Sequence, residues 1–319
     1  MQVIYLDEPF NKKIIYSAPI VLALGFFDGV HLGHQQVIRV AKKEAEKRGL
    51  KLAVMTLDRH PSIAFQNVPQ NSVKYLTPLK RKLELFVKLG ADITYVVALN
   101  EKIVPMGPQE FVDKYMAGLN AAAVVAGEDY TYGKKNIANM QTLAEYSKNR
   151  FEIINVPYLK KNGSKVGSTA VRKYIDTGDL SNANKLLGYT YQTSGVVVHG
   201  KQRGRKLGFP TINLNISDNE RIPGEGIYAV KVTIIGKTVL GMASIGRNET
   251  FGKDQEQTVE INLFDFSQTV YGKEAVVQWY CKLREQQKFP DAESLILQLK
   301  KDKQNTLNHF KEKQIGIYD

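Results

Sequence analysis

The chain of 319 residues has a single cysteine, Cys281, so it cannot form an internal disulfide. Chains without disulfides are typical of reducing compartments. The sequence also lacks any run of the roughly 20 apolar residues that a membrane span requires. Its N-terminal apolar run, residues 18–27, contains Pro19 and continues into Asp28 without a small-residue cleavage site. These absences argue against secreted and integral membrane classes, and we expect a cytoplasmic protein with no membrane partner.

The charge is strongly positive, because 44 lysines and arginines exceed 32 acidic residues and give a net charge of +12. Such an excess suits nucleotides or nucleic acid, and a well-solvated surface explains it equally well. The densest basic cluster, residues 201–206, contains no aromatic residue, whereas single-strand binding surfaces interleave the two. We therefore expect no nucleic-acid partner. No coiled-coil pattern is visible, and the oligomeric state stays open.

The first half of the chain alternates short apolar runs with helical patterns. Continuous apolar runs suit parallel strands that are buried on both faces. The predicted strands are residues 20–27, 51–57, 93–99, 122–127 and 151–158. The segments between them have helical spacing, and this alternation predicts a doubly wound α/β domain with a parallel sheet.

After about residue 187 the pattern changes to short, alternating, β-branched segments separated by glycine-containing turns. These predicted strands are residues 193–200, 211–216, 226–236, 237–246, 257–266 and 274–284. The pattern predicts an antiparallel β-barrel. A C-terminal helix is expected to follow, with Asp291 as its N-cap. We therefore predict two domains, residues 1–186 and residues 187–319.

The segment GFFDGVHLGH, residues 25–34, stands where the first predicted strand meets its helix. Ligands of parallel sheets bind at the carboxyl ends of the strands, and a helix N-terminus there favours phosphate. Gly25 and Gly29 permit tight turns, and His31 and His34 can reach the same point. A metal site is the competing interpretation, but the sequence offers no third and fourth ligand at zinc-site spacing.

A second glycine-rich segment, GVVVHGKQRGRKLGFPTINL, occupies residues 195–214. Gly200, Gly204 and Gly208 recur every four residues among basic side chains, as in a loop that covers phosphates. An exposed basic hairpin is the alternative. Thr211 and Asn213 place two oxygen-bearing side chains on one face of a strand, and Mg²⁺ prefers oxygen ligands.

These motifs resemble those of the H-x-G-H nucleotidyltransferase superfamily and, more narrowly, of bacterial bifunctional riboflavin kinase/FAD synthetases. The resemblance extends to TLDRHPS (56–62), GEDYTYG (127–133) and GSTAVRKYIDTGDLSNANKLLG (167–188), and to GFPTIN in the second half. Arg59 and Gly167 depart from the family pattern. The family implies a nucleotidyltransferase domain followed by a kinase barrel.

For the first domain, the resemblance implies transfer of an adenylyl group from ATP to FMN, which yields FAD and pyrophosphate. His31 and His34 would then stabilise charge at the α-phosphate. The residues implied to contact the nucleotide are Gly25, Phe26, Asp28, Gly29, Asp129, Ser168, Thr169 and Arg172.

For the second domain, the resemblance implies phosphorylation of riboflavin to FMN by ATP. Glu260 would be the base that accepts the ribityl hydroxyl proton, although an alternating strand position also fits a solvent-facing glutamate. Thr211 and Asn213 would hold Mg²⁺ with ATP. The residues implied to contact the nucleotide are Gly200, Arg203, Gly204 and Gly208. Because Arg59 and Gly167 lie in the first half, a riboflavin kinase with a weakened or inactive adenylyltransferase domain is the alternative.

Overall fold

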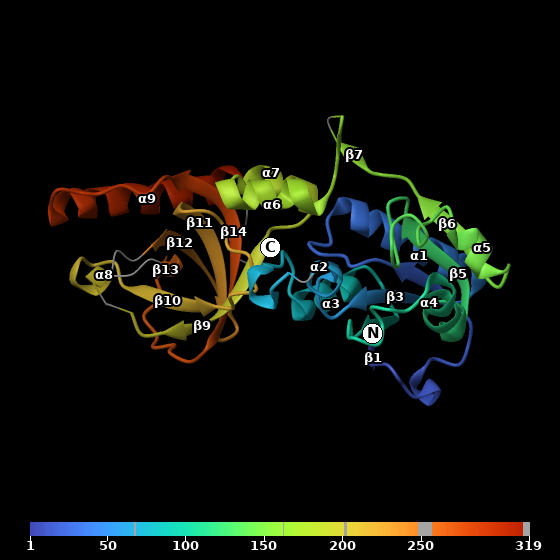
Figure 1. The fold of residues 1–319 in the computed structure, drawn as a ribbon. Coiled ribbons are helices and arrows are strands. Elements are labelled where there is room, and N and C mark those ends of the chain that lie inside the picture. The colour runs from blue at the N-terminus through green and yellow to red at the C-terminus, as the bar shows by residue number, and fades with distance from the viewer. Residues whose placement is uncertain (67, 162, 201–202, 248–256, 315–319) are drawn as a thin grey trace. The chain divides into compact units, whose positions relative to one another are not determined.

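The computed structural model describes residues 1–319 except 67, 162, 201–202, 248–256 and 315–319. The chain forms two compact units, Met1–Ser168 and Thr169–Asp319 (Figure 1). Residues 169–186, which the sequence analysis placed in the first domain, thus lie in the second unit. The functional boundary at 186/187 stays a prediction. Within the described ranges, no helix is long and apolar enough to cross a membrane.

The first unit contains a parallel six-stranded sheet in the order β1-β4-β3-β2-β5-β6. Its strands are β1 (Gln2–Leu6), β2 (Ile20–Leu24), β3 (Lys51–Leu57), β4 (Ile93–Val97), β5 (Ala121–Gly127) and β6 (Glu152–Val156). All residues of β2 and β4 are buried, which explains their unbroken apolar sequence. The predicted doubly wound α/β architecture is confirmed. The edge strand β1 was not predicted.

The helices of this unit connect successive strands. They are α1 (Leu32–Arg48), α2 (Pro61–Phe65), α3 (Leu79–Lys88), α4 (Pro108–Tyr115) and α5 (Leu143–Ser147), with 3₁₀ turns at Lys12–Ile14, Gln70–Ser72 and Ala117–Leu119. A small hairpin, β7 (Lys160–Lys161) and β8 (Ser164–Lys165), follows β6. Helix α1 ends at Gly49, whose φ of 66° is the left-handed conformation that glycine adopts at a helix end.

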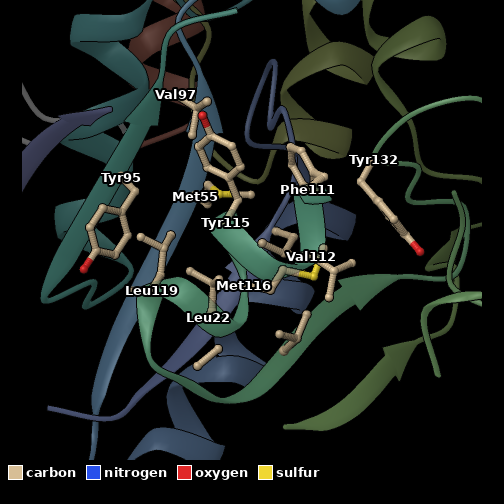
Figure 2. Close-up of a cluster of buried hydrophobic side chains, with 14 of the residues drawn as sticks. Leu22, Met55, Tyr95, Val97, Phe111, Val112, Tyr115, Met116, Leu119 and Tyr132 are labelled. Carbon is tan, nitrogen blue, oxygen red and sulfur yellow. The ribbon is translucent and has the colours of Figure 1, made fainter. Parts of the chain in front are cut away.

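One face of the sheet is covered by α4 and the turn after it. Figure 2 shows Tyr115 and Met116 lying over side chains of the strands, among them Leu22 and Met55. Tyr115, Met116 and Leu22 are fully buried. Burying each large apolar side chain contributes about 1.5–3 kcal/mol to the free energy of folding. This layer therefore stabilises the sheet from which the β2–α1 turn extends.

The second unit contains a closed antiparallel barrel in the order β10-β13-β12-β11-β14-β9. Its strands are β9 (Gln192–Val198), β10 (Thr211–Ile216), β11 (Gly226–Ile234), β12 (Lys237–Arg247), β13 (Gln257–Leu263) and β14 (Glu274–Arg284). The predicted barrel is therefore confirmed. Trp279 is fully buried and donates its indole N–H to Thr193 Oγ1 at 2.9 Å.

Four helices complete the second unit in its described part. They are α6 (Ser168–Thr177), which starts at the last residue of the first unit, α7 (Leu180–Leu187), α8 (Arg203–Lys206) and α9 (Ala292–Glu312). The predicted cap of α9 is present, because Asp291 Oδ1 accepts a hydrogen bond from Ser294 N at 2.8 Å. The short helix α8 in the glycine-rich loop was not predicted.

Helix α9 is tied to the barrel by a buried ion pair. Asp302 has no exposed surface, and its carboxylate accepts three hydrogen bonds of 2.7–3.0 Å from Arg284 on β14. Gln298 Nε2 donates a further bond to Asp302 Oδ1 at 2.8 Å. The charge is thus paired and hydrogen-bonded, as a buried carboxylate requires.

Replacing Asp302 with alanine should destabilise the second unit by about 3–5 kcal/mol, because the mostly buried Arg284 would keep its charge without the carboxylate that balances it. Trp279, the sole tryptophan, reports on this unit, so urea unfolding followed by its fluorescence measures the effect. Lys301→Ala, at an exposed position of the same helix, is the matched control. An unchanged midpoint in Asp302→Ala would show that the pair does not hold α9.

Candidate functional site

The turn between β2 and α1 forces the backbone into an unusual path. Three residues have positive φ: Phe27 (56°), Gly29 (85°) and Val30 (36°). Phe27 and Val30 are almost fully buried, so packing against the surrounding residues maintains this backbone conformation. A Cβ on Gly25 would lie 2.7 Å from the Phe27 ring. Non-glycine residues with positive φ store strain and concentrate at functional sites, which marks this turn as a candidate site.

Asp28 and Ser168 hold the turn in place. Asp28 is 3% exposed, and its Oδ1 accepts hydrogen bonds from Leu76 N at 3.0 Å and Thr77 N at 3.1 Å. Gly29 N donates to Thr77 Oγ1 at 2.8 Å, and Ser168 Oγ donates to the Asp28 carbonyl at 2.8 Å. Both predicted nucleotide contacts therefore have partners inside the protein, and their contact with a nucleotide stays a prediction.

The carbonyl of Phe26 accepts two hydrogen bonds at the start of the turn. The donors are Thr56 Oγ1 at 2.9 Å and Lys82 Nζ at 2.8 Å. Lys82, on α3, is 2% exposed, and burial lowers its pKa to about 8. The sequence analysis missed it, although it occupies the apolar face of α3 with Leu85 and Phe86. A lysine on that face is a signal that could have been found.

His31 and His34 meet at the start of α1, as predicted. His31 is the N-cap, and its Nδ1 accepts a hydrogen bond from His34 N at 3.3 Å. The two rings stack with centroids 3.6 Å apart. His31 is 5% exposed, and burial lowers its pKa to about 4 against the opposing effects of Asp28 and Asp129. At neutral pH the ring is uncharged and sits at the positive end of the helix dipole.

Asp129 and Lys165 form an exposed ion pair that faces the same histidine. Lys165 Nζ lies 2.7 Å from Asp129 Oδ2 and 3.7 Å from the ring centroid of Tyr158. Asp129 raises and Lys165 lowers the pKa of His31, so both charges act on it. Asp129 was a predicted site residue, and Lys165, at the end of the β7–β8 hairpin, was not.

Arg59 and Gly167, the departures that put the first site in question, have simple surroundings. The Arg59 guanidinium pairs with its neighbour Asp58 at 2.9 Å. A Cβ on Gly167 would meet nothing within 4 Å, so the missing serine leaves no packing defect. Thr169 and Arg172 lie on α6 in the second unit, and their part in the first site stays a prediction.

In the barrel, the register brings the second set of predicted residues onto one face. Asn213 on β10 pairs directly with Glu260 on β13, and Thr211 is two residues away on the same strand. Directly opposite residues share a face, so Thr211, Asn213 and Glu260 face the same way, opposite to the buried Val259 and Ile261. These side chains supply oxygen atoms, the donors that a hard divalent cation takes. The described residues contain no group of three or more His, Cys, Asp or Glu that could hold a metal.

The glycine-rich loop lies directly against this face. A Cβ on Gly200 would collide with the Asn213 amide, and one on Gly204 would collide with the carbonyl oxygen of Phe209. Gly208 has a φ of 80°, the left-handed conformation. Arg203 is the first residue of α8, and its side chain and residues 201–202 lie outside the described part. Only glycine lets the loop backbone approach Asn213 so closely.

Two family models match the chain, one for each unit. The model described as FAD synthetase matches residues 14–170, and the model described as riboflavin kinase matches residues 187–310. A bifunctional riboflavin kinase/FMN adenylyltransferase of Listeria monocytogenes is 47% identical over 97% of this chain and 98% of its own length. Its counterpart in Bacillus subtilis is 38% identical over 97% and 98%.

The chain belongs to the bifunctional riboflavin kinase/FMN adenylyltransferase family. It contains both domains of this family, so the alternative of a riboflavin kinase alone is not favoured. A crystal structure from Streptococcus pneumoniae, titled a macrolide-efflux protein, is 35% identical and covers 97% of this chain and 99% of that one, with a TM-score of 0.89. The likeness covers the fold of both units, and that title describes only the other protein.

The depressed pKa of His31 should make the first unit less stable in acid. Between about pH 6.5 and pH 4 the unfolded chain binds a proton at His31 that the folded chain does not, so the free energy of unfolding falls as the pH falls. The loss should reach up to about 3 kcal/mol. His31→Gln should show a smaller loss than wild type in urea unfolding followed by far-UV circular dichroism at about pH 7 and about pH 4.5. An equal loss in both proteins would contradict this, and the Trp279 fluorescence transition of the second unit serves as the control.

Substituting Gly204 with alanine should impair the kinase site alone. Its Cβ would meet the Phe209 carbonyl oxygen, which is backbone and cannot rotate away, so the loop backbone beside Thr211 must shift. We expect kcat/KM for riboflavin phosphorylation to fall by roughly tenfold or more, since a displacement of about 1 Å at a reacting site has large effects. Gly107→Ala, where a Cβ meets nothing within 4 Å, is the control. Normal kinase kinetics in Gly204→Ala would show that the close approach is not needed.

Proposed function

We propose that this chain makes FMN and then FAD, with the two reactions carried out by separate residue sets. The barrel phosphorylates riboflavin at the expense of ATP, and the first unit transfers the adenylyl group of a second ATP to FMN with release of pyrophosphate. Both kinds of enzyme use ATP and a divalent metal. The observation that carries the proposal is that two matched family domains each contain a glycine-built turn beside the expected polar side chains.

In the first unit, His31 is proposed to stabilise the charge that develops at the α-phosphate. Its Nδ1 accepts from His34 N, so in the neutral ring the proton lies on Nε2, which can donate to a phosphoryl oxygen. Because the pKa is about 4, the ring stays neutral near neutral pH and acts there as a neutral hydrogen-bond donor. The stacked His34 and the positive end of the α1 dipole would add to this stabilisation.

Adenylyl transfer of this kind needs no covalent intermediate with the protein. The phosphate of FMN attacks the α-phosphorus and pyrophosphate leaves, so catalysis consists of positioning and charge stabilisation. Gly25, Phe26, Asp28 and Gly29 would set the position of the nucleotide through the turn. Asp129 would contact it from the end of β5. Ser168, Thr169 and Arg172 are proposed to contact its phosphates.

In the barrel, Glu260 is proposed as the general base for the ribityl 5′-hydroxyl of riboflavin. A carboxylate removes the hydroxyl proton as the oxygen attacks the γ-phosphorus. Thr211 and Asn213 would hold Mg²⁺, and the Gly200–Gly208 loop with Arg203 would contact the phosphates of ATP. When bound, the ion would supply positive charge that offsets the charge of the phosphates. The register, which sets Glu260 directly across from Asn213, supports placing base and nucleotide together.

Product analysis tests both assignments at once. With riboflavin, ATP and Mg²⁺, the wild-type chain should form FMN and then FAD. His31→Ala should stop at FMN, with FAD formation reduced at least about 100-fold, because a donor to the developing charge is lost. Glu260→Gln should form FAD only from supplied FMN, because the base is lost.

The informative result is that the two variants lose different reactions. His309→Ala, which removes a histidine on α9, should form both products at wild-type rates and serves as the control. If His31→Ala still makes FAD normally, the charge-stabilising role is wrong. If Glu260→Gln still phosphorylates riboflavin at the wild-type rate, Glu260 is a solvent-facing strand residue.

A further inference from the structure

The buried lysine of α3 has no part in the reactions as described so far. Lys82 is 2% exposed, and its Nζ donates to the Phe26 carbonyl at 2.8 Å. The same Nζ lies 3.4 Å from Thr56 Oγ1 and 4.0 Å from the centroid of the Phe26 ring. Phe26 directly precedes the segment 27–30, which contains the three residues with positive φ and leads to His31. Lys82 therefore contacts the turn from within the protein.

A lysine is a costly way to fill this position. Removing an ammonium group from water costs several kcal/mol, and an apolar side chain of similar length would be buried without that cost. Its hydrogen-bond partners here, a carbonyl and a hydroxyl, are neutral. Asp28 and Asp58 favour the charged form, and burial outweighs them, so the pKa falls to about 8. The position therefore fits a requirement for charge or for a donor, not for packing.

Thr56 already satisfies part of the donor requirement. Its hydroxyl donates to the same Phe26 carbonyl at 2.9 Å, so one hydrogen bond would remain without Lys82. What Thr56 cannot supply is a positive charge. A charge in a buried, weakly screened place acts on an anion at longer range than a hydrogen bond does. The phosphates of a nucleotide at the start of α1 are such anions.

We propose that Lys82 is a positioning residue for adenylyl transfer, which fixes the Phe26 peptide and supplies a buried positive charge beside the phosphate-binding turn. The inference rests on the adenylyl transfer proposed above. Lys82 acts through the turn and through its field, and it does not contact the reacting atoms. The charged groups that act on it are Asp28 in the turn and Asp58 after β3. The Phe26 ring that Lys82 contacts also packs against His60 and Tyr75.

The experiment compares four variants of the full-length enzyme. Lys82→Met removes the charge and the donor, Lys82→Arg keeps a permanent charge, and Thr56→Val removes the second donor to the same carbonyl. Lys42→Met, on the surface of α1, is the matched control. For each protein, kcat and KM for FMN adenylylation are measured across pH, and the riboflavin kinase rate and the thermal midpoint are measured on the same sample.

We expect Lys82→Met to lower kcat for adenylylation by about tenfold or more. KM for FMN, the kinase rate and the thermal midpoint should stay near wild type. Thr56→Val should lower kcat by less than about threefold, because it leaves the charge in place. In wild type, kcat should fall as the pH rises through about 8, where Lys82 loses its proton. Lys82→Arg should lack this alkaline decline, because arginine keeps its charge.

Three results would overturn the inference. Lys82→Met with wild-type kcat and the same alkaline decline would show that the charge does nothing. A matching fall in thermal midpoint and kcat, reproduced by Thr56→Val, would reduce Lys82 to a structural residue. Wild-type enzyme that forms FMN and no FAD would overturn the proposed adenylyl transfer itself, and the inference with it. This last outcome can be told from the other two because it is seen in the wild-type enzyme, before any residue is substituted.

Discussion

Both candidate sites depend on one constraint: buried backbone N–H and C=O groups near the site need hydrogen-bond partners within the protein. Those partners must be supplied without filling the space proposed for an anionic ligand. In the first unit, the chain turns from β2 into α1, and side chains of neighbouring segments hold this turn in place. The Asp28 carboxylate accepts two backbone N–H groups of the segment before α3, and the Phe26 carbonyl accepts from Thr56 and Lys82. These bonds satisfy the buried groups internally and fix the start of α1, where phosphate binding is proposed.

The barrel meets the same constraint with strand register. Its antiparallel pairing satisfies the backbone of β10 and β13, so the side chains of one face are free to carry chemistry. The loop beside these strands is positioned by glycine residues, which permit close backbone packing, whereas side-chain hydrogen bonds position the turn in the first unit. Gly200 brings loop backbone against Asn213 of the polar face, and Gly204 lets the loop pack closely on its own Phe209 carbonyl. A single slip of register would move Glu260 to the interior and end the site.

Local sequence patterns were enough to predict the fold, and they were not enough to predict the supports of the sites. The strand–helix alternation, the barrel strands and the Asp291 cap are properties of neighbouring residues, and each was confirmed. Asp28 with Leu76, or Lys82 with Phe26, joins positions about 50 residues apart, and no periodicity encodes such a pair. Strand β1 was missed because an edge strand has a short, half-exposed pattern. The residues that contact ligands were proposed from motifs, and those that hold them in place required the fold.

The departures at Arg59 and Gly167 can be weighed by what they touch. Arg59 pairs with Asp58, and the other carboxylate oxygen of Asp58 accepts a hydrogen bond from Leu99 N at 2.9 Å. The charge of Arg59 is therefore paired locally, at the end of β3. At Gly167 the backbone has open space, and the next residue, Ser168, keeps its hydroxyl on the Asp28 carbonyl. Neither change reaches the stacked histidines, the positive-φ run or the Phe26 carbonyl. The elements that position charge at the start of α1 are therefore intact, which is the physical reason to expect adenylyl transfer from this unit rather than a remnant of it.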